Sequence, residues 1–187
     1  MPPRATHFES STPILEGTSV QVEGRKVTVQ GPKGTLTRDF VHADVAIERK
    51  GKAVVVSVEF PRSRQIALVG TLISLINNMM VGVLHGVVYK MKIVFAHFPP
   101  SVKVAGDKLT VENFYGEKSM RKAQILPGVT VQVGSDEVIV EGIDITQVAQ
   151  TTANIQAATR LRRKDPRKFQ DGIYVFQKRI GERVWNL

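Results

Sequence analysis

The sequence contains no cysteine and only four histidines among its 187 residues. Without cysteine the chain forms no disulfide, and it offers no thiolate nucleophile and no cysteine-ligated zinc or iron–sulfur site. The histidines, His7, His42, His85 and His97, show no spacing typical of metal ligands, such as HxxxH. We therefore expect neither a metal nor any other cofactor.

Motifs for catalysis are missing as well. The GxSxG and HExxH patterns do not occur, and GPKG at 31–34 lacks the GxxxxGK[ST] spacing of a phosphate-binding loop. We interpret GPKG as a turn between strands that carries an exposed lysine, Lys33. The best carboxylate pair, Asp136-Glu137, falls in a predicted turn, whereas acid–base catalysis needs carboxylates in contrasting environments. We expect no catalytic residues, and hence no enzyme.

One long uncharged segment, residues 65–89, has the length of a transmembrane helix. Asn77, Asn78, Ser74 and His85 lie within it, and polar side chains are costly in lipid. The internal repeat described below also predicts that a helix ends here and a new strand begins. We therefore interpret the segment as a core helix followed by a strand, and expect no membrane partner.

Positive charge is concentrated at one end of the chain. Lys and Arg number 26 against 17 Asp and Glu, a net charge of +9, and 42% of the residues are hydrophobic, which is typical of a folding chain. Residues 160–187 hold nine basic and three acidic residues, a net charge of +6. Such a cluster indicates a polyanion partner. Nucleic acid is the first candidate, and an anionic membrane is the second. An anionic-membrane binder needs an amphipathic basic helix, and Pro166 interrupts the candidate.

The chain contains an internal duplication. Residues 19–30 and 101–112 are identical at seven of twelve positions, with an offset of 82. A repeat of this length is too long for a solenoid unit, so each copy is predicted to be a small domain. Each copy has alternating segments with glycine turns, typical of hairpins, followed by one helical pattern. This predicts an α+β fold, a tandem duplication of a small antiparallel β-sheet packed against one α-helix.

Boundaries follow from the same repeat. A helix is predicted around Ile66–Val83 in the first copy, and Asp144 is the predicted N-cap of the helix in the second. Pro99-Pro100 lies where the first copy passes into the second. The predicted division is an N-terminal extension at 1–12, a first repeat at 13–98, a second repeat at 99–178 and a C-terminal tail at 179–187.

Basic and aromatic residues occur together after the second helix. RLRRKDPRKF, residues 160–169, precedes a predicted strand that has Tyr174 and Phe176 on one face. Lysine and arginine neutralise phosphates and flat side chains stack on bases, so the combination is typical of RNA contact, although at least one of the two aromatics is expected in the core. The segment GEKSMRK, 116–122, is predicted to join the same positive face.

Four segments, residues 22–40, 86–99, 111–131 and 167–175, resemble the universal large-subunit ribosomal protein family called L-six in bacteria and L-nine in the older eukaryotic naming. AHFP and FQDGIYV resemble its eukaryotic and archaeal branch. The resemblance implies a duplicated sheet-and-helix fold. It also implies a structural role in translation, binding large-subunit rRNA near the sarcin–ricin loop and the stalk base, where translation factors dock.

The resemblance further implies neighbouring large-subunit proteins as partners and a cytoplasmic ribosome as location, with nucleolar assembly in a eukaryote. The residues themselves leave open a free RNA-binding regulator acting outside the ribosome. The expected rRNA contacts are basic or aromatic residues of the second repeat: Lys118, Arg121, Lys122, Arg160, Arg162, Arg163, Lys164, Arg167, Lys168, Tyr174 and Lys178. Secondary contacts with rRNA or protein are expected from Lys33, Lys90, Lys92 and Trp185.

Overall fold

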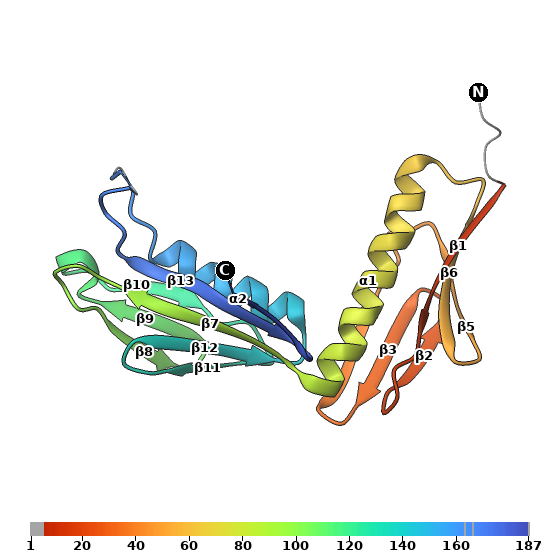
Figure 1. Ribbon diagram of the computed structural model, residues 1–187, viewed down its shortest axis with the longest axis horizontal. Coiled ribbons are helices and arrows are strands. Elements are labelled where there is room, and N and C mark those ends of the chain that lie inside the picture. The colour runs from red at the N-terminus through yellow and green to blue at the C-terminus, as the bar shows by residue number, and fades with distance from the viewer. Residues whose placement is uncertain (1–5, 163, 166, 187) are drawn as a thin grey trace. The chain divides into compact units, whose positions relative to one another are not determined.

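The computed structural model describes residues 6–162, 164–165 and 167–186. Its chain forms two compact units, unit 1 (Met1–His85) and unit 2 (Gly86–Leu187). Both units combine antiparallel strands with one long helix, which confirms the predicted α+β class (Figure 1).

Unit 1 contains two three-stranded sheets, with strand orders β1-β6-β5 and β2-β3-β4. The helix α1 packs against strands of both sheets, and its buried side chains include Val69, Leu72, Ile76 and Val83, spaced three, four or seven residues apart. The elements in chain order are β1 (His7–Pro13), β2 (Ser19–Glu23), β3 (Lys26–Gly31), β4 (Gly34–Asp39), β5 (Ala46–Lys50), β6 (Ala53–Glu59) and α1 (Ser63–His85).

By length and composition α1 could cross a membrane, since its most apolar window has a mean hydropathy of 1.9. The core helix of a globular unit passes the same test, and 39% of that window is buried inside the structure. The buried face lies on β1, β3 and β6. In unit 1, therefore, α1 has the position expected of a core helix.

Unit 2 has a five-stranded antiparallel sheet of order β11-β12-β7-β13-β14 and a three-stranded sheet of order β10-β9-β8. The helix α2 contacts both sheets and covers the core between them (Figure 1). The elements are β7 (Val87–Val94), β8 (Ser101–Ala105), β9 (Lys108–Glu112), the 3-10 turn η1 (Phe114–Gly116), β10 (Arg121–Gln124), β11 (Val129–Val133), β12 (Glu137–Gly142), α2 (Ile145–Ala158), β13 (Gly172–Ile180) and β14 (Arg183–Asn186).

The duplication seen in the sequence is present in the structure. Val20 pairs with Val29 in the β2–β3 hairpin, and Val102 pairs with Val111 in β8–β9, so the two hairpins share one register. The hairpins β5–β6 and β11–β12 also correspond, as do the two helices. Asp144 caps α2 as predicted, its carboxylate accepting the Thr146 backbone N–H at 2.8 Å.

The units divide earlier than the boundary expected at Pro99. In unit 2 Met91 of β7 pairs with Val138 of β12, as Thr12 of β1 pairs with Val54 of β6 in unit 1. Strand β7 is therefore the counterpart of β1, and the second copy begins near Gly86. The sequences of these two strands have diverged, which hides the start of the repeat. Pro99-Pro100 lies in the loop between β7 and β8.

Both ends of the chain also differ from the prediction. Residues 7–12, expected in an extension, belong to β1, which pairs with β6 along its whole length. In the expected tail, Arg179 and Ile180 complete β13, and β14 pairs back onto it. These last two strands extend the sheet of unit 2 and have no counterpart among the described strands of unit 1.

Candidate nucleic-acid interface

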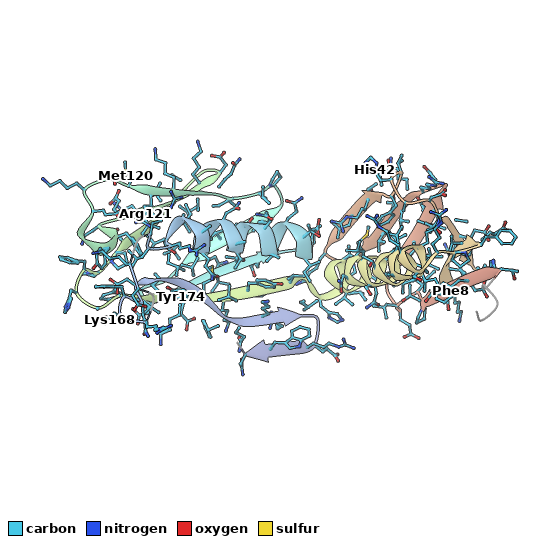
Figure 2. The ribbon with its side chains drawn as sticks, turned by 90° about the horizontal axis from the view of Figure 1, so that it is seen from above. Phe8, His42, Met120, Arg121, Lys168 and Tyr174 are labelled. Atoms are coloured by element: carbon cyan, nitrogen blue, oxygen red, sulfur yellow. The ribbon has the colours of Figure 1, made fainter. Side chains whose placement is uncertain are left out.

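Three segments meet at one end of unit 2: residues 95–100, 113–122 and 159–171, here called the loop end. The side chain of Asp171 accepts the Ala96 backbone N–H at 3.2 Å, and the Asn113 amide donates to the Pro99 carbonyl at 3.2 Å. Figure 2 shows Arg121, Lys168 and Tyr174 at this end of the unit. The loop end thus joins the two basic sequences that were expected to share one face.

The basic segment, residues 160–168, begins where α2 ends and is tied to the sheet there. The buried Thr159 hydroxyl donates to the Ile155 carbonyl at 3.2 Å and accepts the Ile173 N–H at 3.1 Å. Further along, Asp165 accepts the backbone N–H groups of Arg167 and Phe169, each at 3.0 Å. These bonds hold the backbone at both ends of the segment, and its described basic side chains are exposed.

Two open grooves border this segment, with volumes of about 960 and 530 Å³. Arg160, Arg162 and Lys164 line both of them. Tyr174 lines the larger groove, and Lys122 lines the smaller one. The structure therefore surrounds the cations with concave surface that a chain of phosphates and bases can follow.

Arg121, expected to bind rRNA, is held by several groups of unit 2, and its side chain is 20% exposed. Its Nε and Nη2 donate to both carboxylate oxygens of Glu117 at 2.8 and 2.6 Å, and Nη1 donates to the carbonyls of Ala158 and Arg160, each at 3.0 Å. Its guanidinium also lies 4.4 Å from the centre of the Phe114 ring. The hydrogen bond from Arg121 holds the pKa of Glu117 below its ordinary value. Arg121 therefore positions the basic segment.

Aromatic side chains that the sequence did not single out support the same segment. The Phe169 ring lies 5.3 Å from the Lys164 ammonium and packs edge-on against Tyr115, with ring centres 5.9 Å apart. Tyr115 has a φ of 54°, which is strained for an aromatic residue, and Asn113 has a φ of 57°. No pattern marks Tyr115 for this conformation, although Asn113 and Gly116 beside it are typical of tight turns.

The other residues expected at this surface are exposed there, apart from Arg163, which lies outside the described residues. Tyr174 is 41% exposed, and Phe176 is half-buried, so one aromatic faces solvent and the other is partly packed. The exposed basic residues of the loop end are Lys118, Lys122, Arg160, Arg162, Lys164, Arg167 and Lys168.

Lys178 and Trp185 lie away from the loop end. They pair with each other across β13 and β14, and the Lys178 ammonium is 5.5 Å from the Tyr89 ring centre, a phenol whose pKa is raised by burial. Gly172 is the first residue of β13, next to the loop end, and Lys178 lies six residues further along the strand. This separation corresponds to about 20 Å along β13. Trp185 is 41% exposed.

Lys90 and Lys92 lie on β7 at different distances from the loop end. Lys92 pairs with Tyr174 near the start of β13, and Lys90 pairs with Gln177 further along the strand. Of these two lysines, Lys92 alone is therefore adjacent to the candidate surface.

Lys33 has a structural contact in unit 1. Its ammonium donates to the carbonyl of His85 at 2.6 Å, and its backbone N–H donates to the carbonyl of Val83 at 3.0 Å. Carbonyls in the last turn of a helix lack partners within the helix, and a cation is favourable there. GPKG thus caps the end of α1.

The part of the chain that the structure describes contains no group of three His, Asp or Glu side chains placed to hold a metal. The loop end instead offers exposed cations, flat side chains and a backbone held by hydrogen bonds. These groups can bind phosphates and stack on bases.

Comparison with known proteins gives consistent matches. The model of the family described as Ribosomal protein L6 matches residues 14–86 and, a second time, residues 98–172. The large ribosomal subunit protein uL6 of Aeropyrum pernix is 49% identical over 175 residues, which cover 93% of this chain and 96% of the relative. Proteins of the same name from Ignicoccus hospitalis and Methanospirillum hungatei are 48% and 47% identical, and the matches cover 98% and 94% of their lengths.

Proposed function

Because the chain belongs to the ribosomal protein L6 family, we propose that it is a non-catalytic, structural constituent of the large ribosomal subunit and binds large-subunit rRNA through the loop end of unit 2. Its similar relatives are named as large-subunit proteins, and the matches span nearly their whole length. The chain is then one component of a ribonucleoprotein that acts in translation.

The observation that carries this proposal is the set of unpaired cations at the loop end. Among the described residues, Arg160, Arg162 and Lys164 form no ion pair with a carboxylate, and neither do Lys118, Lys122, Arg167 or Lys168. The nearby acids have other partners: Glu117 binds Arg121, and the Asp165 carboxylate accepts the backbone N–H of Arg167. This charge is therefore available for phosphates.

The rRNA site that we propose lies near the sarcin–ricin loop and the stalk base, beside neighbouring large-subunit proteins and the region where translation factors dock. In this mechanism the loop end neutralises phosphates where RNA helices converge, while the two sheets and α2 hold the loops in register. The location is the cytoplasmic ribosome.

Charge reversal tests the rRNA surface. The test uses one triple variant that carries Arg162→Glu, Lys164→Glu and Lys168→Glu. Its affinity for large-subunit rRNA should fall. The slope of log affinity against log salt should decrease by roughly 0.7–0.9 for each phosphate that is no longer neutralised. Binding is measured by filter retention over a series of salt concentrations.

A matched control reverses three exposed cations of unit 1, Lys52, Arg62 and Arg64. It changes the net charge equally and should leave most of the affinity and the salt slope intact. An equal loss of affinity in both triple variants, or an unchanged slope in the first, contradicts the proposed surface.

A further inference from the structure

The loop between β7 and β8 exposes two phenylalanines. Phe95 is 44% exposed and Phe98 is 46% exposed, although each lies within two residues of a hydrogen bond that anchors the loop. Large apolar side chains grouped on a surface typically mark an interaction site. The rRNA contacts expected from the sequence include neither residue.

This loop is held on two sides, so its rings are presented by an ordered backbone. Asp171, which is 6% exposed, accepts the Ala96 N–H, and Asn113 donates to the Pro99 carbonyl. The Phe98 ring lies against Gly116, where a Cβ would be 3.4 Å from the ring atoms. The missing side chain of Gly116 thus leaves room for the ring beside η1, where it remains 46% exposed.

Two exposed lysines lie close in sequence to the groups that hold the rings. Lys92 lies three residues before Phe95 on β7, and Lys118 lies two residues after Gly116; both are exposed. Of the acids near the loop, Asp171 is buried and Glu117 is bound to Arg121, whereas Glu137 is exposed and pairs with Lys92 across β12 and β7. An apolar ring among cations suits a partner that combines negative charge with flat apolar faces, which are the properties of RNA with unpaired bases.

We propose that Phe95 and Phe98 form a stacking platform for unpaired bases, so that the loop end binds RNA at an internal loop or bulge in preference to a continuous duplex. The inference rests on the proposed rRNA binding and deepens it, because it names the class of RNA structure that is recognised. Arg160, Arg162 and Lys164 would hold the flanking phosphates, and the rings would receive the bases.

Two synthetic RNAs of equal length test this, one a hairpin with a bulge of unpaired purines that includes 2-aminopurine, the other fully paired. In the full chain carrying Phe95→Leu and Phe98→Leu, affinity for the bulged RNA should fall roughly ten-fold or more. Affinity for the paired RNA and both salt slopes should stay unchanged, because every cation is retained. Wild-type protein should change the 2-aminopurine fluorescence, and the variant should not.

Phe60→Leu is the matched control, since Phe60 is 74% exposed in unit 1 and should affect neither RNA. Unchanged binding of the bulged RNA by the double variant overturns the platform, and so does an equal loss of affinity for both RNAs. If the platform is overturned in either way but the triple charge-reversal variant of the loop end still loses affinity for large-subunit rRNA, the proposed rRNA binding stands without the platform. Failure of the wild-type chain to bind the bulged RNA at low salt overturns the platform, and the measurement on large-subunit rRNA then decides the proposed rRNA binding by itself.

Discussion

At the scale of single residues, Arg121 joins three segments of unit 2 through one guanidinium. It binds Glu117 across the turn before β10, donates to the carbonyls at the end of α2, and lies over the Phe114 ring. A lysine offers no planar fork and would satisfy only part of this set. The sequence places Arg121 in a basic cluster but carries no sign of the carbonyls, which lie 37 and 39 residues away.

The Glu117–Arg121 pair predicts a specific pH dependence. The pKa of Glu117 is below its ordinary value of 4.5 in the folded chain, so the unfolded chain binds more protons as the pH falls through this range. Wild type should be more stable than Glu117→Gln at pH 7, and this advantage should disappear as the pH falls below about 4.5.

The measurement is the urea midpoint of unit 2 at several pH values. Trp185, the one tryptophan of the chain, belongs to unit 2 and reports its unfolding by fluorescence. In an Arg121→Met background, exchange of Glu117 for Gln should no longer produce this pH-dependent difference. An advantage of wild type that stays constant or grows in acid contradicts the assigned role of the pair.

At the scale of elements, the end of α1 depends on the GPKG loop. Lys33 caps the last carbonyls, and Gly31 lies so close to the helix that a Cβ there would be 2.7 Å from a Val83 methyl carbon and 2.9 Å from the Val83 carbonyl oxygen. The sequence predicted the turn but not its contact with the helix, because Val83 is 52 residues from Gly31. The motif is therefore a packing and capping device in unit 1.

Two glycine substitutions should have opposite effects on unit 1. Gly31→Ala should destabilise it by about 1–3 kcal/mol, because the methyl group meets backbone that cannot move freely. Gly70→Ala should stabilise it by about 0.5–1 kcal/mol, because Gly70 is exposed within α1 and its added methyl meets nothing within 4 Å. Hydrogen exchange of the α1 amides measures the change in stability of unit 1 in each variant. Amide protection that is unchanged in Gly31→Ala would contradict the close contact between Gly31 and α1.

Elements with local signals were predictable. The hairpins β2–β3 and β8–β9 have alternating valines and a glycine turn, and Asp144 marks the start of α2. The path of residues 113–122 could not be predicted, because Tyr115 adopts a left-handed backbone conformation that its residue type disfavours. Tyr115 also packs edge-on against Phe169, a contact between segments that are distant in the sequence.

At the scale of the whole molecule, two thirds of the net positive charge, +6 of +9, belongs to unit 2, and residues 160–187 account for that +6. The basic run after α2 was predictable as a surface because its residues are adjacent in sequence and follow a helix end. Lys178 was grouped with them through the family resemblance, and strand geometry separates it from the loop end. The charge-reversal test decides whether the residues of the basic run contact rRNA.

Truncation tests where the second unit begins. A fragment of residues 86–187 should fold cooperatively, because it retains β7, the central strand of the five-stranded sheet, with Val87 and Met91 fully buried. A fragment of residues 99–187 should not, because β12 and β13 lose the strand that joins them. Amide dispersion in NMR spectra distinguishes the two, and a well-folded shorter fragment would contradict the boundary at Gly86.

The central claim is that the chain is a structural constituent of the large ribosomal subunit. The direct measurement is its stoichiometry on particles separated by sedimentation in high salt, with a tagged copy expressed in the cells from which the chain comes. We predict one copy for each large subunit, retained after the salt wash. A sub-stoichiometric amount that the wash removes would contradict the claim and indicate an RNA-binding regulator outside the ribosome.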